Sequence, residues 1–596
     1  MLEPTRDRLD YSSMLRPPED GFELKYALVC TYSLDLSALL AALLPLGFNG
    51  DAESLCRNNP VFMLHVFNKL LPKIHVFCDA ASIKVPDLRN NKLLVLLDRI
   101  VFPVRHKTAF HPKFWLLKFD RNGEYRYRLA ILSKNLTFDR SWDVAIFFDG
   151  KVKRGLCNGT PLASVIDFLK RSQRGKANQL HELSVIGNEI RHVEFSNDEI
   201  QPEELALIPF GVNPEAAAPD INFLNSDATF YRLLVMSPFL SPETVSDLFQ
   251  RGRPGAEKLL FTRKTALMGF TQEQISDIQC YCVKDEIVLG EKSELLGYPI
   301  EKPQEEDIHA KIYLFQQYQN NSPYLYLGSA NLTQNGTKEK NVELLVRVKL
   351  RGHNIYETIR KDLLPGDQNG VFELCETIPS PDKDAEEMNQ LKQEYRNLTN
   401  IWKNLSAKVK KQKDLYSVTL HCPVKFTSEY KIEISPLIGK WKLFSSKIKF
   451  EPQQAETLSD FYKIRLSHKH ICLERLLVID TLSLWDLRNI RQEALDSSCL
   501  GKADDILEYL SYVLSEDSYA LALQKKEQNK SQAHSKNVRN NHFALYEKLL
   551  YWTATDKQRL QEIRNIIHRR QRVNSKGTEA LLALCETFYH AAGEER

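Results

Sequence analysis

The sequence contains no apolar run of the roughly eighteen residues that a membrane-spanning helix requires. Its opening residues, MLEPTRDRLDYSSM, lack the apolar core of a signal peptide. The eleven cysteines form no CxxC pair and lie in apolar surroundings, so we interpret them as reduced core residues and not as a disulfide framework or a zinc site. These absences predict a cytoplasmic protein without a membrane partner or a bound metal.

A large excess of one charge is also missing. Lys and Arg outnumber Asp and Glu by only 80 to 77, which gives a net charge of +3 over 596 residues. Any nucleic-acid surface must therefore be a local basic patch. Hydrophobic content of 43% and charged content of 26% are ordinary for a globular protein, and the length allows roughly three or four domains.

One set of polar residues occurs twice in the chain. Each set begins with His-x-Lys at the start of an apolar run, FHPKFWLLKF or IHAKIYLF, and the two histidines are 309 − 111 = 198 residues apart. Ser-x-Asn and then an acid follow in both sets. The residues are His111, Lys113, Ser133, Asn135 and Asp143 in the first set, and His309, Lys311, Ser329, Asn331 and Glu343 in the second. Because side chains alternate along a strand, each His and Lys share one face, an arrangement suited to an oxyanion such as phosphate.

A third His-x-Lys, at His534 and Lys536, lies in the polar run KKEQNKSQAHSKNVRNN and has no apolar strand around it. We interpret it as a solvated loop. The two repeated sets have an alternative explanation, a pair of similar structural hairpins whose polar residues only occupy strand ends. Four matched polar positions, found twice, favour a functional site over that alternative.

The repeat extends beyond these residues. LKYALVCTYSL at 24–34 reads as a strand that leads into a helix, and YRLLVMSPFLSPETVSDLF at 231–249 repeats this order. Strands that alternate with helices predict a largely parallel sheet covered on both faces. We therefore expect two α/β halves, at 1–205 and 206–378, with a joint near 198–224.

The two sets resemble the half-sites of the phospholipase D superfamily, which carry His-x-Lys and Gly-Ser-x-Asn and meet across a pseudo-twofold axis. The resemblance covers roughly residues 24 to 350 and implies a duplicated phospholipase D-like fold of two αβα sandwich halves. The wider family has an Asp seven residues after each His, where this chain has Lys118 and Gln316. Lack of that Asp is a trait of the tyrosyl-DNA phosphodiesterase branch. The first half also has Leu132 where the second has Gly328.

The resemblance implies an enzyme that cleaves phosphodiesters in two steps. One histidine attacks phosphorus to form a phosphohistidine, and the other protonates the leaving group. It assigns His111 as nucleophile and His309 as acid, although the sequence also allows the reverse. The charge on the phosphate would be stabilised by Lys113, Lys311, Asn135 and Asn331, with hydroxyl donors from Ser133 and Ser329. Asp143 and Glu343 would each fix the tautomer of an imidazole. No metal or other cofactor is expected, because the lysines neutralise the phosphate.

We predict a metal-independent nuclease that acts on DNA or RNA. Two alternatives stay open: a catalytically degenerate nucleic-acid-binding subunit of a larger complex, and a phospholipase, for which no membrane-binding segment is evident. Bacterial proteins of this general build resemble components of anti-phage systems. By analogy, that resemblance suggests a helicase or another defence-system protein as a partner.

Beyond residue 378 we expect an α+β extension. Apolar residues from Met388 to Val409 alternate steps of three and four, which predicts an amphipathic helix at 379–413 that lies on its own enzyme domain or, as an alternative, pairs with a helix of another chain. Four lysines, Lys408, Lys410, Lys411 and Lys413, would crowd the end of this helix. A β-rich segment at 414–482 and a helical region at 483–596 follow, with a flexible polar stretch at 524–542.

Two further groups in the extension have a plain interpretation beside a functional one. We interpret His468 and His470 as exposed strand residues, with metal binding as the minor alternative. The final helical region carries a basic stripe of Arg564, His568, Arg569, Arg570 and Arg572. A solvated helix face is the default explanation for it, and phosphate contact is the alternative.

Overall fold

The computed structural model describes most of the chain. The described residues are 14–47, 59–86, 92–138, 141–173, 180–212, 227–284, 294–295, 298–299, 308–318, 321–338, 340–366, 370–375, 383–424, 428–481, 485–515, 518, 520–525, 545–555, 560–566, 568, 583–584 and 586–590. None of the helices within these ranges combines the length and the apolar character needed to cross a membrane.

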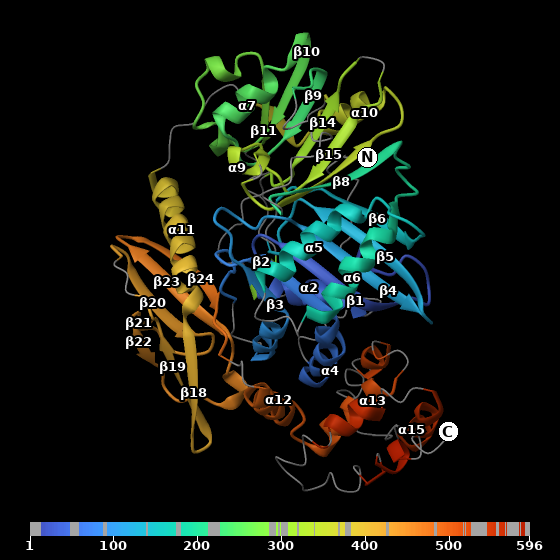
Figure 1. Cartoon of the computed structure of the whole chain (residues 1–596). Coiled ribbons are helices and arrows are strands. Elements are labelled where there is room, and N and C mark those ends of the chain that lie inside the picture. Colours follow the sequence, from blue (N-terminus) through green and yellow to red (C-terminus); the bar gives the residue numbers. More distant parts are fainter. Residues whose placement is uncertain are drawn as a thin grey trace.

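The first half is built on a seven-stranded sheet (Figure 1). Its strands are β1 (Glu23–Thr31), β2 (Ile74–Asp79), β3 (Val101–Val104), β4 (Phe114–Arg121), β5 (Glu124–Leu132), β6 (Ala145–Val152) and β7 (Val193–Ser196), in the order β3-β2-β1-β4-β5-β6-β7. Its helices are α2 (Leu36–Gly47), α4 (Pro60–Leu70), α5 (Thr160–Ser172) and α6 (His181–Glu189). Only β1, β2 and β3 pair in parallel, so the prediction of a largely parallel sheet is wrong. The hairpins that carry the repeated motif make the rest of the sheet antiparallel.

The second half repeats this order in an eight-stranded sheet. Its strands are β8 (Glu204–Phe210), β9 (Phe230–Met236), β10 (Gly252–Phe261), β11 (Gln279–Val283), β14 (Ile312–Gln316), β15 (Tyr324–Gly328), β16 (Glu343–Lys349) and β17 (Phe372–Leu374), in the order β17-β11-β10-β9-β14-β15-β16-β8. Its helices are α7 (Pro242–Phe249), α9 (Gln334–Thr337) and α10 (Ile355–Leu363), and β12 (Glu294–Leu295) pairs with β13 (Tyr298–Pro299) outside the main sheet. Strands β11-β10-β9-β14-β15-β16 match β3-β2-β1-β4-β5-β6 in order. The prediction of a duplicated α/β fold is therefore confirmed.

Both faces of the first sheet are buried, which explains its nearly continuous apolar runs. Along β1, Ala27 and Val29 belong to the core on one face, while Leu28 and Cys30 belong to the core on the other. The second of these cores continues into the other half through β9, β14 and β16. The two halves therefore share one hydrophobic core.

Backbone pairing across the two halves places the motif residues. Phe110 pairs with Val342, and Trp142 pairs with Ile308, each in parallel. The amide of His111 donates to the carbonyl of Val342 (2.9 Å), and the amide of His309 donates to that of Trp142 (3.0 Å). Each histidine is thus bonded to the residue that precedes the acid of the other half.

The extension begins with α11 (Lys383–Ile401), which packs against β24 (Figure 1). The remaining strands form two small sheets: β18 (Ser406–Gln412), β19 (Leu415–His421) and β22 (Lys447–Lys449) in one, and β20 (Lys431–Pro436), β21 (Lys442–Leu443), β23 (Phe461–His468) and β24 (Ile471–Val478) in the other. Residues Leu391, Tyr395, Leu398 and Trp402 of the predicted apolar seam are buried against this β-rich segment. The seam packs mainly on the strands of the β-rich segment and less on the two enzyme halves.

The prediction that this helix continues to residue 413 is wrong. The helix ends at Ile401, a 3-10 turn covers Trp402–Asn404, and Val409 lies in strand β18. The four lysines at 408–413 occupy this strand and the turn after it, where they are exposed. Alternation in SAKVKKQ fits the pattern of a strand as well as the spacing of three and four fits a helix, and pairing with β19 decides between them.

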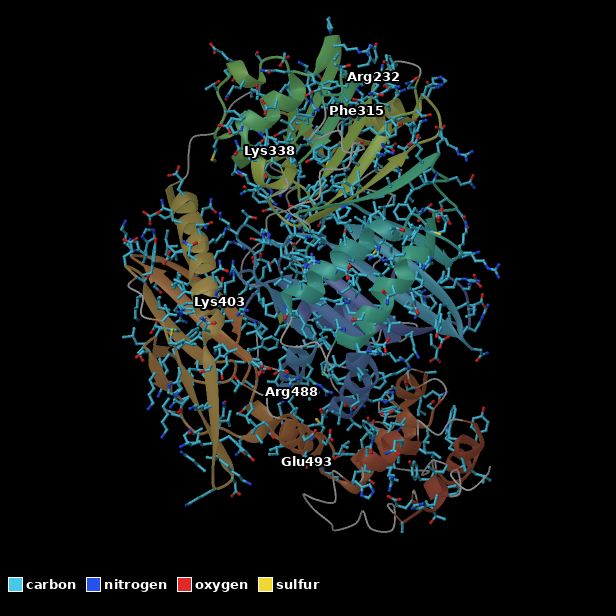
Figure 2. All side chains as sticks on the ribbon, viewed as in Figure 1. Arg232, Phe315, Lys338, Lys403, Arg488 and Glu493 are labelled. Atoms are coloured by element: carbon cyan, nitrogen blue, oxygen red, sulfur yellow. The ribbon has the colours of Figure 1, made fainter. Side chains whose placement is uncertain are left out.

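A buried ion pair fastens the extension to the first half. Both oxygens of Asp98 bind the guanidinium of Arg491 on α12 (Trp485–Cys499), and Asp98 also accepts from the hydroxyl of Ser459 (3.1 Å) and the amide of Asp460 (3.0 Å). Burial opposes the charge on Asp98, yet Arg491 holds the pKa of this carboxyl below its usual value. Figure 2 shows α12, marked by Arg488 and Glu493, between the β-rich segment and the last helices, α13 (Ala503–Val513) and α15 (Leu545–Thr555).

The flexible stretch predicted at 524–542 lies outside the described residues from 526 onward, and 524–525 are helical. Of the basic stripe, Arg569, Arg570 and Arg572 also lie outside them. Arg564 and His568 both bind the carboxylate of Glu586, at 2.9 and 2.6 Å. Both side chains are therefore engaged by a carboxylate of the same chain, which agrees with the structural explanation for the stripe.

Candidate active site

The ten repeated residues gather at the seam between the two halves. Lys113 and Lys311 directly precede β4 and β14, while Ser133 and Ser329 directly follow β5 and β15. Because β4 and β14 are antiparallel to the strands that follow them, the start of one and the end of the next lie at the same edge of each sheet. Eight of the ten side chains are buried, and His309 and Asp143 are partly exposed.

The acids and histidines pair across the two halves. Nδ1 of His111 lies 2.9 Å from Oε2 of Glu343, and Nδ1 of His309 lies 3.4 Å from Oδ1 of Asp143. The carbonyl of Ser133, 3.1 Å away, also faces Nδ1 of His309. Carboxylates and carbonyls only accept hydrogen bonds, so Nδ1 carries the proton in both rings. Nε2 is therefore the nitrogen left for a substrate in each histidine.

The two serines hold the acids and do not face a substrate as donors. The hydroxyl of Ser329 donates to Oε2 of Glu343 (2.5 Å), and that of Ser133 lies 3.2 Å from Oδ1 of Asp143. Each serine oxygen also accepts from the backbone amide of the residue after the acid, Leu344 or Val144. The expectation that these hydroxyls contact the phosphate is corrected: they fix the two carboxylates.

The lysines are buried side chains held close to the histidines. Nζ of Lys113 donates to the carbonyl of His111 (2.9 Å), and Nζ of Lys311 donates to that of His309 (2.5 Å). Burial first and the charge of Lys311 second hold the pKa of Lys113 well below its usual value. Two ammonium groups close together in a buried site repel each other, and a bound anion would offset this repulsion.

Burial also lowers the pKa of both histidines to about 4. For His111, Glu343 raises the value again but does not outweigh burial and the nearby lysines. For His309, the charge of Lys311 adds to the effect of burial, and Asp143 opposes both. Both imidazoles are thus neutral at pH 7 in the unliganded protein.

The two asparagines differ in their partners. Oδ1 of Asn135 accepts from the amide of Ser33 (3.3 Å). Oδ1 of Asn331 is buried and has no hydrogen-bond partner within the described part of the chain. The amide of Asn331 is therefore the less constrained of the two.

The difference between Leu132 and Gly328 does not disturb the motif. Gly328 has φ +153°, and a Cβ there would lie 2.3 Å from the carbonyl oxygen of Leu344, so only glycine fits. Leu132 is buried opposite Ala145, which leaves room for its side chain. In both halves the amide of the next residue donates to the strand beside it: Ser133 to Val144 (2.9 Å) and Ser329 to Leu344 (3.1 Å).

Lys118 and Gln316, which replace the family's Asp, lie inside strands away from the motif. Nζ of Lys118 binds the carboxylate of Glu189 (2.6 Å), and Nε2 of Gln316 donates to the carbonyl of Asn321 (2.8 Å). Both positions therefore have structural roles in this chain.

Three further residues near His111 were not predicted, and only Tyr32 contacts its ring directly. The ring of Tyr32 packs 4.8 Å from the His111 imidazole, centre to centre. Buried Asp79 accepts from the amide of Phe110, next to His111, and binds Nη1 of Arg396 on α11 at 2.8 Å. Asp79 could have been noticed as a carboxylate at the end of a buried strand. Arg396 gave no signal, because it arrives from the extension almost 300 residues away.

The described residues contain no group of three or more His, Cys, Asp or Glu side chains arranged to hold a metal ion. His468 ends β23, partly exposed beside Tyr430, and His470 is exposed in the turn before β24. The interpretation of both as exposed strand residues is met only in part, because His468 is in a strand but partly exposed and His470 is exposed but in a turn.

Comparisons with known proteins support the resemblance to the phospholipase D superfamily. Residues 297–372 match a family described as the NgoFVII restriction endonuclease N-terminal PLD domain. This range contains the whole second set, from His309 to Glu343, so the recognition made from the sequence is confirmed. No curated protein matches the chain.

Two solved structures are similar to the chain at low sequence identity. One is the yeast tyrosyl-DNA phosphodiesterase, with 10% identity and a TM-score of 0.36, covering 59% of this chain and 87% of that chain. The other is the phosphatidylserine synthase of Haemophilus influenzae Rd KW20, with 10% identity and a TM-score of 0.34, covering 66% of this chain and 89% of that chain.

Proposed function

We propose that the protein is a metal-independent phosphodiesterase that cleaves nucleic acid through a phosphohistidine. One observation carries this proposal: two imidazoles, each with Nδ1 engaged by the other half, stand with two buried lysines in one site. That set supplies a nucleophile, a proton donor and two cations, which together are sufficient for displacement at phosphorus.

In the first step, Nε2 of His111 attacks phosphorus while the bond to the leaving oxygen breaks. That oxygen takes the proton from Nε2 of protonated His309. In the second step, neutral His309 removes a proton from water as the water oxygen attacks phosphorus and displaces Nε2 of His111. His111 and His309 then regain their starting protonation states, and one phosphodiester bond has been hydrolysed.

The low pKa of His309 makes its protonation depend on the substrate. Burial and the neighbouring ammonium groups disfavour imidazolium in the empty site. A phosphodiester anion between Lys113 and Lys311 offsets these positive charges and raises the pKa of both histidines. The acid is therefore charged mainly when an anion is bound.

We propose nucleic acid as the substrate because the matched family is described as a restriction endonuclease domain. A role in anti-phage defence with a helicase partner, and a cytoplasmic location, remain predictions.

The experiment is cleavage of labelled single- and double-stranded DNA and RNA in excess EDTA, beside hydrolysis of bis(p-nitrophenyl) phosphate. The expected result is cleavage that survives chelation and is lost in His111→Ala. Activity abolished by EDTA and restored by magnesium would overturn the lysine-based mechanism. Absence of activity on every phosphodiester, with binding retained, would favour the non-catalytic subunit.

A further inference from the structure

Cationic side chains converge where α11 and β24 meet the first half. We call the following three residues the junction cluster: Arg105, after β3; Lys392, on α11; and Arg475, on β24. Nε of Arg105 donates to the carbonyl of Thr399 on α11 (3.3 Å), and Nη1 of Arg475 donates to the carbonyl of Glu474 (2.8 Å). The extension therefore supplies two of the three cations and the backbone contact of the third.

The junction cluster is continuous with the His111 half-site through Tyr32. The hydroxyl of Tyr395 on α11 donates to the carbonyl of Leu476, next to Arg475 (3.2 Å). On the same helix the guanidinium of Arg396 lies 6.0 Å from the centre of the Tyr32 ring. The Tyr32 ring in turn lies 5.7 Å from Nζ of Lys113. Positive charge thus extends from the reacting centre to the docked extension.

Ion pairs within the part of the chain that the structure describes do not neutralise the junction cluster. No carboxylate lies within ion-pair distance of Arg105, Lys392 or Arg475 anywhere in the described ranges, whereas nearby Arg396 is paired with buried Asp79. Arg105 and Lys392 are exposed and Arg475 is half-buried, so an anion in solution can reach the junction cluster. Cations that no carboxylate neutralises form a local positive surface that attracts an anion.

The loop that leads into His111 adds to this positive surface. Lys107 in this loop is exposed, and the hydroxyl of Thr108 donates to the carbonyl of Lys340, another exposed cation, from the second half. Two cations on the His309 side have carboxylate partners: Lys134 lies 3.8 Å from Asp143, and Lys264 lies 3.1 Å from Glu373. Exposed cations of the junction cluster and of this loop therefore lie on the His111 side of the site.

We infer that the junction cluster binds the phosphate backbone of a nucleic-acid strand on the His111 side of the bond that is cleaved. The inference rests on the proposed function and makes its substrate class more specific. Cations on three separate elements, beyond the two lysines of the site, suit a ligand with several phosphates in a row. A single small phosphodiester would leave them unused.

The first test is to replace Arg105, Lys392 and Arg475 together by Gln and to measure binding of a fluorescent single-stranded oligonucleotide by anisotropy from 50 to 300 mM salt. The slope of log affinity against log salt should fall by about 2, because each phosphate contact with a single strand contributes about 0.7. The control replaces Lys408, Lys410 and Lys411 of β18 by Gln. It removes the same charge from an exposed strand, and its slope should stay close to that of the parent.

Cleavage separates this inference from the proposed function. In the triple variant, the rate on an oligonucleotide should fall at least tenfold more than the rate on bis(p-nitrophenyl) phosphate. Lys392→Glu alone, at an exposed position, should weaken binding in the same direction and guards against misfolding of the triple variant. Parental slope and affinity in both variants would overturn the inference while leaving the phosphodiesterase in place.

Two other outcomes are decisive. A parent protein that cleaves no phosphodiester, but whose oligonucleotide binding depends on the junction cluster, would refute the proposed catalysis and support the surface. If the triple variant loses binding to anionic phospholipid vesicles but still binds the oligonucleotide, the junction cluster recognises lipid headgroups and the inference is overturned.

Discussion

The two half-sites contain the same set of residues, but the contacts that orient His111 are closer and more buried than those that orient His309. His111 has a fully buried carboxylate at 2.9 Å and a tyrosine ring against its imidazole. The acid of His309 lies 3.4 Å away and is 14% exposed, and a backbone carbonyl shares the contact. At the position of Tyr32 the second half has Pro238, since the hydroxyls of Thr31 and Ser237 make equivalent turns.

This difference agrees with a division of labour between the histidines. A nucleophile needs a fixed direction of attack, which the enclosed ring of His111 provides. A group that gives and then takes a proton must exchange with water, and partly exposed His309 is better placed for that. Duplication thus supplies two similar parts, and the surroundings make them unequal.

Removal of each histidine should give the largest contrast. His111→Ala should abolish turnover and leave no covalent species. His309→Ala should lose about 10²- to 10⁴-fold with an alkoxide leaving group, but recover much of the first-step rate on a p-nitrophenyl diester, because p-nitrophenolate leaves without a proton. Stopped-flow absorbance and mass spectrometry of the trapped adduct measure both effects.

The His309 variant should accumulate a phosphohistidine at residue 111, since the second step lacks its base. A matched His534→Ala variant, at the unrelated His-x-Lys, should behave as the parent. An adduct on His309 in the parent would reverse the two roles while leaving one shared site.

Replacement of each acid by its neutral amide should lower the cleavage rate by different amounts in the two half-sites, with a smaller difference than for the histidine variants. Glu343→Gln should lower the cleavage rate by about 10- to 100-fold, because the dry His111 ring loses its charged partner. Asp143→Asn should cost less, since the carbonyl of Ser133 still accepts from Nδ1 of His309. Equal losses in single-turnover assays would contradict the unequal support described above.

Substitution of the glycine before Ser329 should destabilise the protein more than substitution of the leucine at the matching position of the first half. Gly328→Ala places a Cβ against a backbone oxygen and should lower the free energy of unfolding by about 1–3 kcal/mol. The matched change in the first half, Leu132→Met, conserves volume and should cost less than about 1.5 kcal/mol. Denaturant unfolding monitored by circular dichroism compares the two, and a silent Gly328→Ala would show that the strand shifts freely.

Protonation should give the smallest of the four effects. With pKa values of about 4 in the native protein and 6.5 as the usual value, both histidines bind fewer protons when folded between pH 6.5 and 4. Stability should therefore fall as the pH drops through this window. Bound sulfate should raise both pKa values, so its affinity should rise as the pH falls from 7 to 5.

Calorimetry in buffers of different ionisation enthalpy measures the protons taken up with sulfate. The uptake should shrink in His309→Asn. Affinity that is independent of pH would contradict the linkage between anion binding and histidine charge.

The sequence was sufficient to predict the duplicated fold, and the ten residues that it singled out are the ones the structure brings together at the seam, because the same residue types recur at the same strand ends. It could not predict the crossing, since either acid could have reached either ring. It also misplaced the hydroxyls of Ser133 and Ser329, whose partners depend on where the acids lie in space. Arg396 and the junction cluster were out of reach, because they enter from elements whose docking depends on buried contacts such as Asp98 with Arg491.

Each histidine is paired with the acid of the other half, so the two halves depend on each other for a complete site. A substitution at Glu343 in the second half changes the surroundings of the His111 imidazole in the first half, so the sequences of the two halves constrain each other. A gene fragment that ends at the joint would encode a histidine without its acid and an acid without its histidine. Two such fragments could restore a complete set only by meeting face to face, which makes the fused chain a permanent version of a symmetric pair.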